Sequence, residues 1–147
     1  MIKKYMDIAY NEAVKAFKLG EVPVGCVITY NNELLVKTHN LKEINNCALY
    51  HAELIAIKKA SKKLNTWRLD DCDMYVTLDP CIMCAGAIKN ARIRNLYCGT
   101  NNFYNNKNLL NTIFNEKDNN SVVNYNSNLD KDRCSRILKD FFANKRC

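Results

Sequence analysis

The sequence predicts an α/β fold in which helices cover a mixed β-sheet. Segments with helical and strand periodicity alternate in the order α-β-β-α-β-α-β up to Gly99. Strands joined by a tight turn pair antiparallel and strands joined through a helix pair parallel, so this order requires both kinds of pairing. The chain has 147 residues, 48% of them hydrophobic, which is enough to bury the core of one domain spanning residues 1–147.

The first segment, residues 2–19, is predicted to be an amphipathic helix that packs on the sheet. Its apolar residues recur at spacings of three and four: Ile2, Tyr5, Met6, Ala9, Ala13, Ala16 and Phe17. Gly20 follows as a helix stop.

A β-hairpin is expected next. Residues 22–30 are strand-like, with Pro23 at the entrance of the strand, where a missing backbone N–H is tolerated. The Asn-Asn pair at 31–32 forms the turn, and residues 33–38 return as the second strand. A loop over residues 41–50 then leads away from the hairpin.

The middle of the chain continues with alternating helices and strands. We expect helices over residues 52–64 and 81–91, and strands over residues 73–78 and 95–98, with Gly99 ending the last strand. Four lysines lie on the first of these helices: Lys58, Lys59, Lys62 and Lys63. A solvated helix face explains them most simply, and contact with phosphate is a second use.

The last third of the chain is less regular. Residues 101–128 are rich in Asn, with one short helix expected around residues 109–114 and a short fifth strand over residues 122–125. Residues 129–146 form a final amphipathic helix. Four apolar side chains are expected to face the core from it (Ile137, Leu138, Phe141 and Phe142), while its lysines and arginines stay in solvent.

Composition restricts the class of protein. The formal net charge is +7, which favours a polyanionic partner. No long uncharged apolar run predicts a membrane span, and the acidic residues of the first helix are unlike a signal peptide. The eight cysteines therefore favour bound metal in a reducing cytosol over secreted disulfides. Three of them lie in apolar strand-like runs and are expected to be core residues: Cys26, Cys72 and Cys98.

The chemistry is expected to lie between His51 and Cys84. His51, Cys81 and Cys84 are three ligands suited to zinc, and Glu53 stands two residues after the histidine. Both cysteines fall at the start of a predicted helix, where the helix dipole favours thiolate over thiol. The histidine also falls at a predicted helix start, so two helix N-termini are expected to hold the metal from both sides.

Glu53 distinguishes a catalytic zinc site from a structural one. A catalytic site leaves one coordination position to water, and a carboxylate beside that water can take its proton and deliver it to substrate. The alternative is a closed structural site in which Cys47 supplies the fourth ligand. A closed site does not require Glu53, so we favour the catalytic reading.

The H-A-E and P-C-I-M-C motifs match the H-x-E…P-C-x-x-C pattern of zinc-dependent nucleobase deaminases. The longer match resembles the bacterial-type tRNA adenosine deaminase family. It includes EVPVG at residues 21–25, WRL at 67–69, YVTLDPCIMCAGAI at 75–88 and DFF at 140–142. The resemblance covers nearly the whole chain and is weakest in the Asn-rich segment.

The resemblance implies a three-layer α-β-α cytidine-deaminase-like fold with a five-stranded mixed sheet. It also implies a homodimer in the cytoplasm that converts adenosine to inosine at the wobble position of a tRNA anticodon stem-loop. One Zn²⁺ per chain and a catalytic water would serve the reaction. Carried across by residue, the metal ligands are His51, Cys81 and Cys84, the proton shuttle is Glu53, the nucleoside contacts are Asn40, the Ala52 backbone and Val22, and the RNA contacts are Phe142 and Arg146.

The sequence departs from the family pattern at three places. Asp79 replaces the usual Glu before Pro-Cys, and Tyr50 replaces a small residue before the histidine. Asn102 stands where the family has an acidic residue near the RNA. We expect that loss of this charge relaxes discrimination between RNA and single-stranded DNA.

Two other functions compete with the leading one. The first is a deaminase of a free base or nucleoside, such as cytosine or guanine, although a small neutral substrate does not need the basic final helix. The second is a non-catalytic, zinc-stabilised RNA-binding protein or inactive subunit, which Glu53 argues against because such a protein can lose its catalytic carboxylate.

Overall fold

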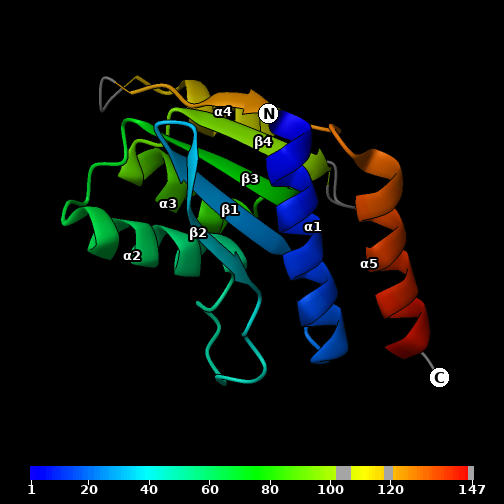
Figure 1. The fold of residues 1–147 in the computed structure, drawn as a ribbon. Helices are drawn as coiled ribbons and strands as arrows, with labels where there is room; N and C mark the ends of the chain where they lie inside the picture. The colour runs from blue at the N-terminus through cyan, green and yellow to red at the C-terminus, as the bar shows by residue number, and fades with distance from the viewer. Residues whose placement is uncertain (102–106, 118–120, 146–147) are drawn as a thin grey trace.

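The computed structural model describes residues 1–101, 107–117 and 121–145 of the chain. A single five-stranded sheet has the strand order β2-β1-β3-β4-β5, with helices on both of its faces (Figure 1). The strands are β1 (Gly25–Tyr30), β2 (Glu33–His39), β3 (Cys72–Leu78), β4 (Asn95–Thr100) and β5 (Asn124–Asn126). The helices are α1 (Ile2–Lys18), α2 (Ala52–Leu64), α3 (Ile82–Ala91), α4 (Lys107–Asn115) and α5 (Lys131–Lys145). The expected three-layer α-β-α fold is confirmed.

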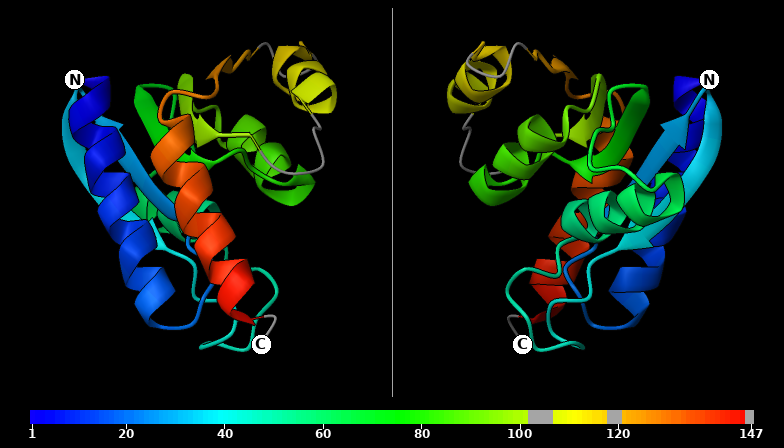
Figure 2. Two further views of the ribbon diagram at one scale, coloured as in Figure 1. Left: turned by 90° about the vertical axis from the view of Figure 1, so that its right-hand side faces the viewer. Right: turned by 90° about the vertical axis from the view of Figure 1, so that its left-hand side faces the viewer.

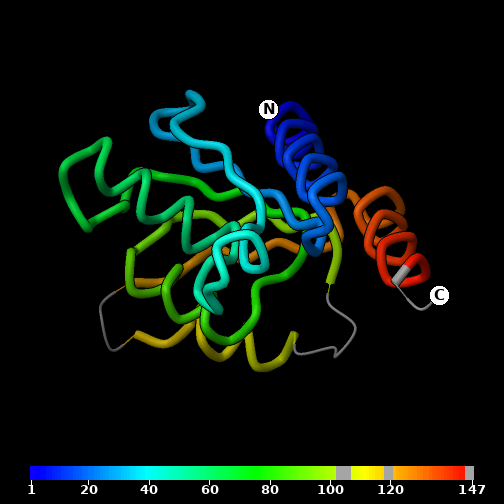
Figure 3. Tube along the Cα trace, turned by 90° about the horizontal axis from the view of Figure 1, so that it is seen from below, coloured from blue at the N-terminus to red at the C-terminus, as the bar shows by residue number. Residues whose placement is uncertain are grey.

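One helical layer is formed by the two ends of the chain, and the other is formed by its middle. Helices α1 and α5 lie side by side on one face, and α2, α3 and α4 cover the other (Figures 2 and 3). The larger apolar core lies between the sheet and the α2–α3 layer, and it includes Cys26, Cys72 and Cys98, as expected. A smaller core with Tyr5, Met6 and Tyr75 lies under α1.

The sheet has the mixed pairing that the order of elements predicts. Strand β1 pairs antiparallel with both β2 and β3, whereas β3–β4 and β4–β5 are parallel and are joined through α3 and α4. Asn31 and Asn32 turn the hairpin with positive φ angles of 51° and 64°, the left-handed conformation that a two-residue type I′ turn requires. Because β3 and β4 are parallel, their carboxyl ends meet at one edge of the sheet.

All five strands differ from their predicted boundaries by one to three residues, β5 spanning 124–126 instead of 122–125, and for β1 and β4 the structure shows the cause. Strand β1 begins at Gly25 instead of Val22 because the Val24 N–H donates to the Val22 carbonyl at 2.8 Å, forming a tight turn centred on Pro23. Strand β4 does not end at Gly99 but continues to Thr100. Gly99 is required by close packing instead of by the end of a strand, because a Cβ at that position would lie 2.5 Å from the Cys134 sulfur of α5.

The C-terminal prediction needs two corrections. Helix α5 starts at Lys131, two residues later than expected. Ile137, Leu138 and Phe141 are buried as predicted, but Phe142 is 38% exposed and does not face the core. Phe141 already occupies the inward position of this turn, where its ring meets Phe17 of α1.

Two expectations from composition can be compared with the described residues. No helix among them is long and apolar enough to cross a bilayer. The seven cysteines in the described part of the chain are free thiols.

Candidate metal centre and active site

Two helix N-termini meet at the site, as the sequence predicted. His51 is the N-cap of α2 and Cys81 is the N-cap of α3, both with extended backbone dihedrals. Cys84 lies one turn into α3, so its side chain is on the same helix face as Cys81. Pro80 stops β3 from continuing and fixes the entry into α3.

The three predicted ligands come together in space. The His51 Nδ1 atom is 3.7 Å from the Cys81 sulfur and 3.4 Å from the Cys84 sulfur. The three ligand atoms all lie within 4.8 Å of one another. Among the described residues, this is the group of metal-binding side chains that the fold assembles, and Cys47 does not join it.

The donor set fits a zinc ion with one open position. One imidazole nitrogen and two sulfurs supply three of the four positions of a tetrahedral site, the number that catalytic zinc sites take from protein. The closed site with Cys47 as fourth ligand is therefore not supported by the geometry.

The pKa values of the two thiols are shifted in opposite directions. The pKa of Cys81 is lowered to about 4 because the Cys84 thiol and His51 hydrogen-bond to its sulfur, and the same contact raises the pKa of Cys84. The Cys81 hydrogen bond also raises the pKa of His51. Because a thiolate at Cys81 is favoured even without a cation, the site is prepared for a metal that binds sulfur as thiolate.

Glu53 stands beside this cluster in the first turn of α2. Its side chain is buried, with only 4% of the residue exposed. Burial raises the pKa of its carboxyl to about 7. A carboxyl group that gains and loses a proton near neutral pH is suited to proton transfer.

Asn40 and Ala52 contact each other directly. The Asn40 Oδ1 atom accepts a hydrogen bond from the Ala52 backbone N–H at 2.9 Å, and the Thr38 hydroxyl donates to the Ala52 carbonyl at 2.7 Å. Strand β2 thus holds the first residue of α2, which follows His51. The Ala52 N–H is occupied by this bond, and the Asn40 Nδ2 group donates to no other group among the residues that the structure describes.

The structure describes two of the four other predicted substrate and RNA contacts. Val22 is half-buried and packs on the main core just before β1. Phe142 lies exposed on α5. Asn102 and Arg146 lie outside the described residues.

Two buried acidic residues near the site, Glu21 and Asp79, make contacts that were not predicted from the sequence. The Glu21 carboxylate accepts hydrogen bonds from the backbone N–H groups of Glu43 and Ile44, at 3.0 and 2.7 Å, and so pins the 41–50 loop. The Asp79 carboxylate, just before Pro80, accepts hydrogen bonds from Tyr125 and Ser127. An acidic residue next to an apolar run is the sequence signal in both cases, because burial requires such a carboxylate to be hydrogen-bonded.

A mixed sheet carrying one histidine, two cysteines and a buried glutamate at two helix N-termini defines the deaminase class of protein. A family model described as MafB19-like deaminase matches residues 2–146. The tRNA-specific adenosine deaminase of Streptococcus pyogenes serotype M18 is 36% identical over 143 residues, which are 97% of this chain and 90% of the relative. The chain therefore belongs to the family of tRNA-specific adenosine deaminases.

Two further comparisons agree. The tRNA-specific adenosine deaminase of Bacillus subtilis is 45% identical over 95 residues, a match that spans 65% of this chain but only 59% of the relative. A solved structure from a study of A-to-I editing by tRNA:A34 deaminases superposes with a TM-score of 0.83 at 31% identity. It covers 92% of this chain and 99% of the solved chain.

Proposed function

We propose that this chain is one deaminase domain, residues 1–147, that hydrolyses adenosine to inosine at the wobble position of a tRNA anticodon. The observation that carries the proposal is the buried Glu53 carboxyl beside the cluster of His51, Cys81 and Cys84. A metal cluster alone would fit a structural site. A buried carboxyl with a pKa of about 7 next to an incomplete ligand set fits catalysis.

One zinc ion per chain would be held by His51, Cys81 and Cys84. When bound, zinc lowers the pKa of a coordinated water to about 7 and supplies hydroxide at neutral pH. The protein residues do the remaining work. Glu53 takes a proton released by the water and delivers it to the purine ring while the oxygen adds to C6. Glu53 then takes the remaining proton from the hydroxyl now on C6 and passes it to the departing amino group, so that the C6–N bond breaks, ammonia leaves and the C6 carbonyl of inosine forms.

Asn40 orients the nucleoside in this proposal. Its Oδ1 atom is committed to Ala52, so its Nδ2 group donates to the sugar or base of the target nucleotide. Val22 lines the base pocket, and the Ala52 backbone positions Asn40 instead of contacting the substrate. An anticodon loop presents its bases unpaired, so little unstacking energy is needed to bring the adenosine to the site.

The RNA partner is supported by charge and by the relatives. The net charge of +7 provides salt-dependent attraction to phosphates. Phe142, exposed on α5, is a proposed contact of the anticodon loop, and Asn102 and Arg146 are further proposed RNA contacts. A homodimer in the cytoplasm is part of the same proposal, and sedimentation of the purified protein tests the dimer.

The test is a deamination assay on an anticodon stem-loop with adenosine at the wobble position. Free adenosine, cytosine and guanine are assayed alongside, and Glu53→Ala is the matched control. We expect inosine in the stem-loop with the native protein. The Glu53→Ala protein should lose about a hundredfold or more of the rate, the usual contribution of a general acid–base group, and should still bind one zinc. Turnover of a free base alone would assign the chain to the small-molecule deaminases.

A further inference from the structure

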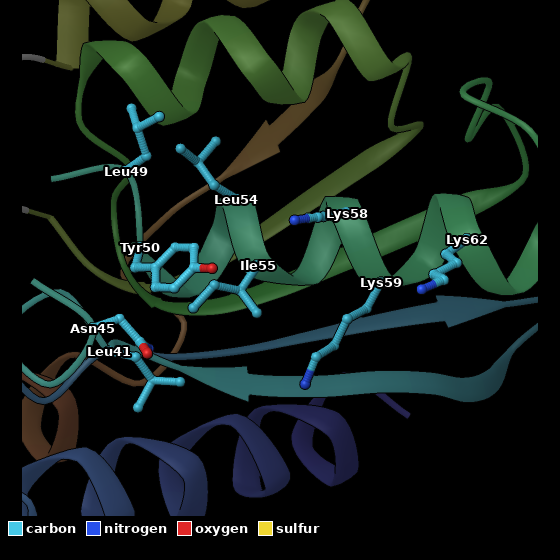
Figure 4. Close-up of a pocket in the computed structure, with 9 residues that line it drawn as sticks. All are labelled: Leu41, Asn45, Leu49, Tyr50, Leu54, Ile55, Lys58, Lys59 and Lys62. Carbon is cyan, nitrogen blue, oxygen red and sulfur yellow. The ribbon is translucent and has the colours of Figure 1, made fainter. Parts of the chain in front are cut away.

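A groove beside the active site is not used by the chemistry described above. It lies between the 41–50 loop and the outer face of α2 and has a volume of about 560 Å³. Its lining includes the apolar or aromatic side chains of Leu49, Tyr50 and Ile55 and the lysines Lys58, Lys59 and Lys62 of α2 (Figure 4). The groove is therefore apolar and aromatic at one end and cationic along the helix.

Tyr50 fixes the groove relative to the metal site. It directly precedes His51, and its backbone is held on both sides. The Tyr50 N–H donates to the Cys47 carbonyl, and the Tyr50 carbonyl accepts from the Leu41 N–H, both at 3.1 Å. The ring stands in the groove next to Ile55 (Figure 4). The backbone that carries this ring therefore continues directly into the first of the clustered metal-binding side chains.

The three lysines are available for a partner. All three are exposed, and among the described residues none forms an ion pair or hydrogen bond. Lys63, on the same helix, differs because its ammonium donates to the Leu35 carbonyl at 3.0 Å. From Lys58 to Lys62 the helix rises about 6 Å, at 1.5 Å per residue, so the three charges form a short basic stretch along the helix.

We propose that this groove is a second nucleic-acid site, in which a base flanking the reacting adenosine stacks on Tyr50 and the adjoining phosphates lie along Lys58, Lys59 and Lys62. This proposal rests on the proposed function. It adds the path that the single strand takes as it leaves the active site. Aromatic rings with a basic track are the usual means of binding single strands without reading their sequence.

Charge also decides against a second copy of the chain as the occupant. A two-fold contact places the same surface of both copies together. The three lysines of each copy would then face those of the other, with no carboxylate in the groove lining to balance them. An RNA strand instead supplies the opposite charge.

Binding is measured apart from catalysis, by fluorescence anisotropy of a labelled anticodon stem-loop on Glu53→Ala protein. In that background, the triple change Lys58→Gln, Lys59→Gln and Lys62→Gln should weaken binding. The slope of log affinity against log salt should fall by about 2, since each phosphate contact on a single strand contributes about 0.7. Lys63→Gln is the matched control and should leave the slope unchanged.

Tyr50→Ala should weaken binding about tenfold, and Tyr50→Phe should restore it, because stacking needs only the ring. A triple variant with the affinity and slope of Lys63→Gln would overturn the groove as an RNA site. A triple variant that changes only the sedimentation of the protein would assign the groove to contact between copies and overturn it equally. Absence of deamination by the native protein, with lysine-dependent binding intact, would instead count against the proposed function.

Discussion

The Asn40 side chain holds the backbone N–H of Ala52 through a 2.9 Å hydrogen bond. This bond joins the end of the hairpin to the helix turn that carries His51 and Glu53. It also explains why an asparagine is needed. The amide oxygen performs a structural task, and in the proposed function the amide nitrogen donates to the substrate. Serine or aspartate could accept the same bond but could not donate in the same geometry.

Asn40→Ala should therefore reduce kcat/KM on the stem-loop by about 10- to 100-fold, the range expected for one or two lost hydrogen bonds to a bound substrate. Zinc content should be unchanged. Thr38→Val is the matched control, because it removes the other side-chain bond to the Ala52 peptide but no group that faces the substrate. Equal losses of kcat/KM in both variants, with equal losses of stability, would mean that Asn40 acts only on the fold.

Metal binding should depend on Cys81 and not on Cys47. Cys81→Ser removes one of three clustered ligand atoms, so the purified protein should hold much less zinc and unfold at a lower temperature, since bound metal stabilises the folded state. Cys47→Ser should retain one zinc per chain and full activity. Loss of zinc from Cys47→Ser, measured by elemental analysis, would restore the closed four-ligand site.

The clustering of His51, Cys81 and Cys84 could be predicted because such side chains are visible in short motifs. A histidine and two cysteines at helix starts fix both the residue types and the faces on which they lie. The alternating elements likewise predicted the mixed sheet. Strand ends were predicted less well, because the tight turn at Pro23 and the packing of Gly99 against Cys134 depend on contacts between distant segments.

Hydrogen bonds between residues far apart in the chain could not be predicted from the sequence. Glu21 bonds the 41–50 loop, and Asp79 bonds Tyr125, some 46 positions away in the chain. The residues near each carboxylate in the sequence do not indicate which distant group will donate a hydrogen bond to it. Phe141 and Phe142 show the same limit. Both are apolar neighbours on one helix, and only the position of α1 decides that Phe141 turns inward.

A third prediction concerns Glu12, a buried carboxylate of α1 that lies next to the site through His39. It is 3.0 Å from the His39 Nδ1 and 2.7 Å from the Lys15 ammonium. Burial alone would raise the pKa of Glu12, but the hydrogen bonds from Lys15 and His39 outweigh it and lower the pKa below 4.5. A carboxyl with a lowered pKa in the folded state adds stability above its unfolded pKa, and this stability is lost as the pH falls through the folded value.

Glu12→Gln should therefore lower the free energy of unfolding by about 1 to 2 kcal/mol at pH 7. The difference from the native sequence should shrink below about pH 4.5, because the Glu12 carboxyl then becomes protonated first in the unfolded state and, at lower pH, also in the folded state. Asp70→Asn, which removes an exposed carboxylate paired with Arg68, should have little effect at either pH. Urea unfolding at pH 7 and pH 3.5 measures both, and a pH-independent loss in Glu12→Gln would contradict the charged pairing.

The last prediction concerns Asp79, whose carboxylate is buried where β3 leads into Cys81. Its two oxygens accept hydrogen bonds from the Tyr125 hydroxyl at 2.6 Å and the Ser127 hydroxyl at 2.7 Å. No cation pairs with it among the described residues. These two hydroxyls therefore stabilise the charge and join β5 to the metal-binding turn.

Tyr125→Phe should lower the free energy of unfolding by about 2 kcal/mol, because hydrogen bonds to buried charged groups contribute about 1.5 to 3 kcal/mol. Tyr97→Phe is the matched control. It makes the same chemical change on the neighbouring strand β4, at a ring that stacks on Tyr75 and whose hydroxyl makes no hydrogen bond to any described residue. Adding Asp79→Asn to Tyr125→Phe should recover part of the loss, since an uncharged amide costs less to leave with one partner. Urea unfolding of the native protein, Tyr125→Phe, Asp79→Asn and their double variant measures the coupling, and a Tyr125→Phe protein as stable as Tyr97→Phe would show that Asp79 does not depend on this bond.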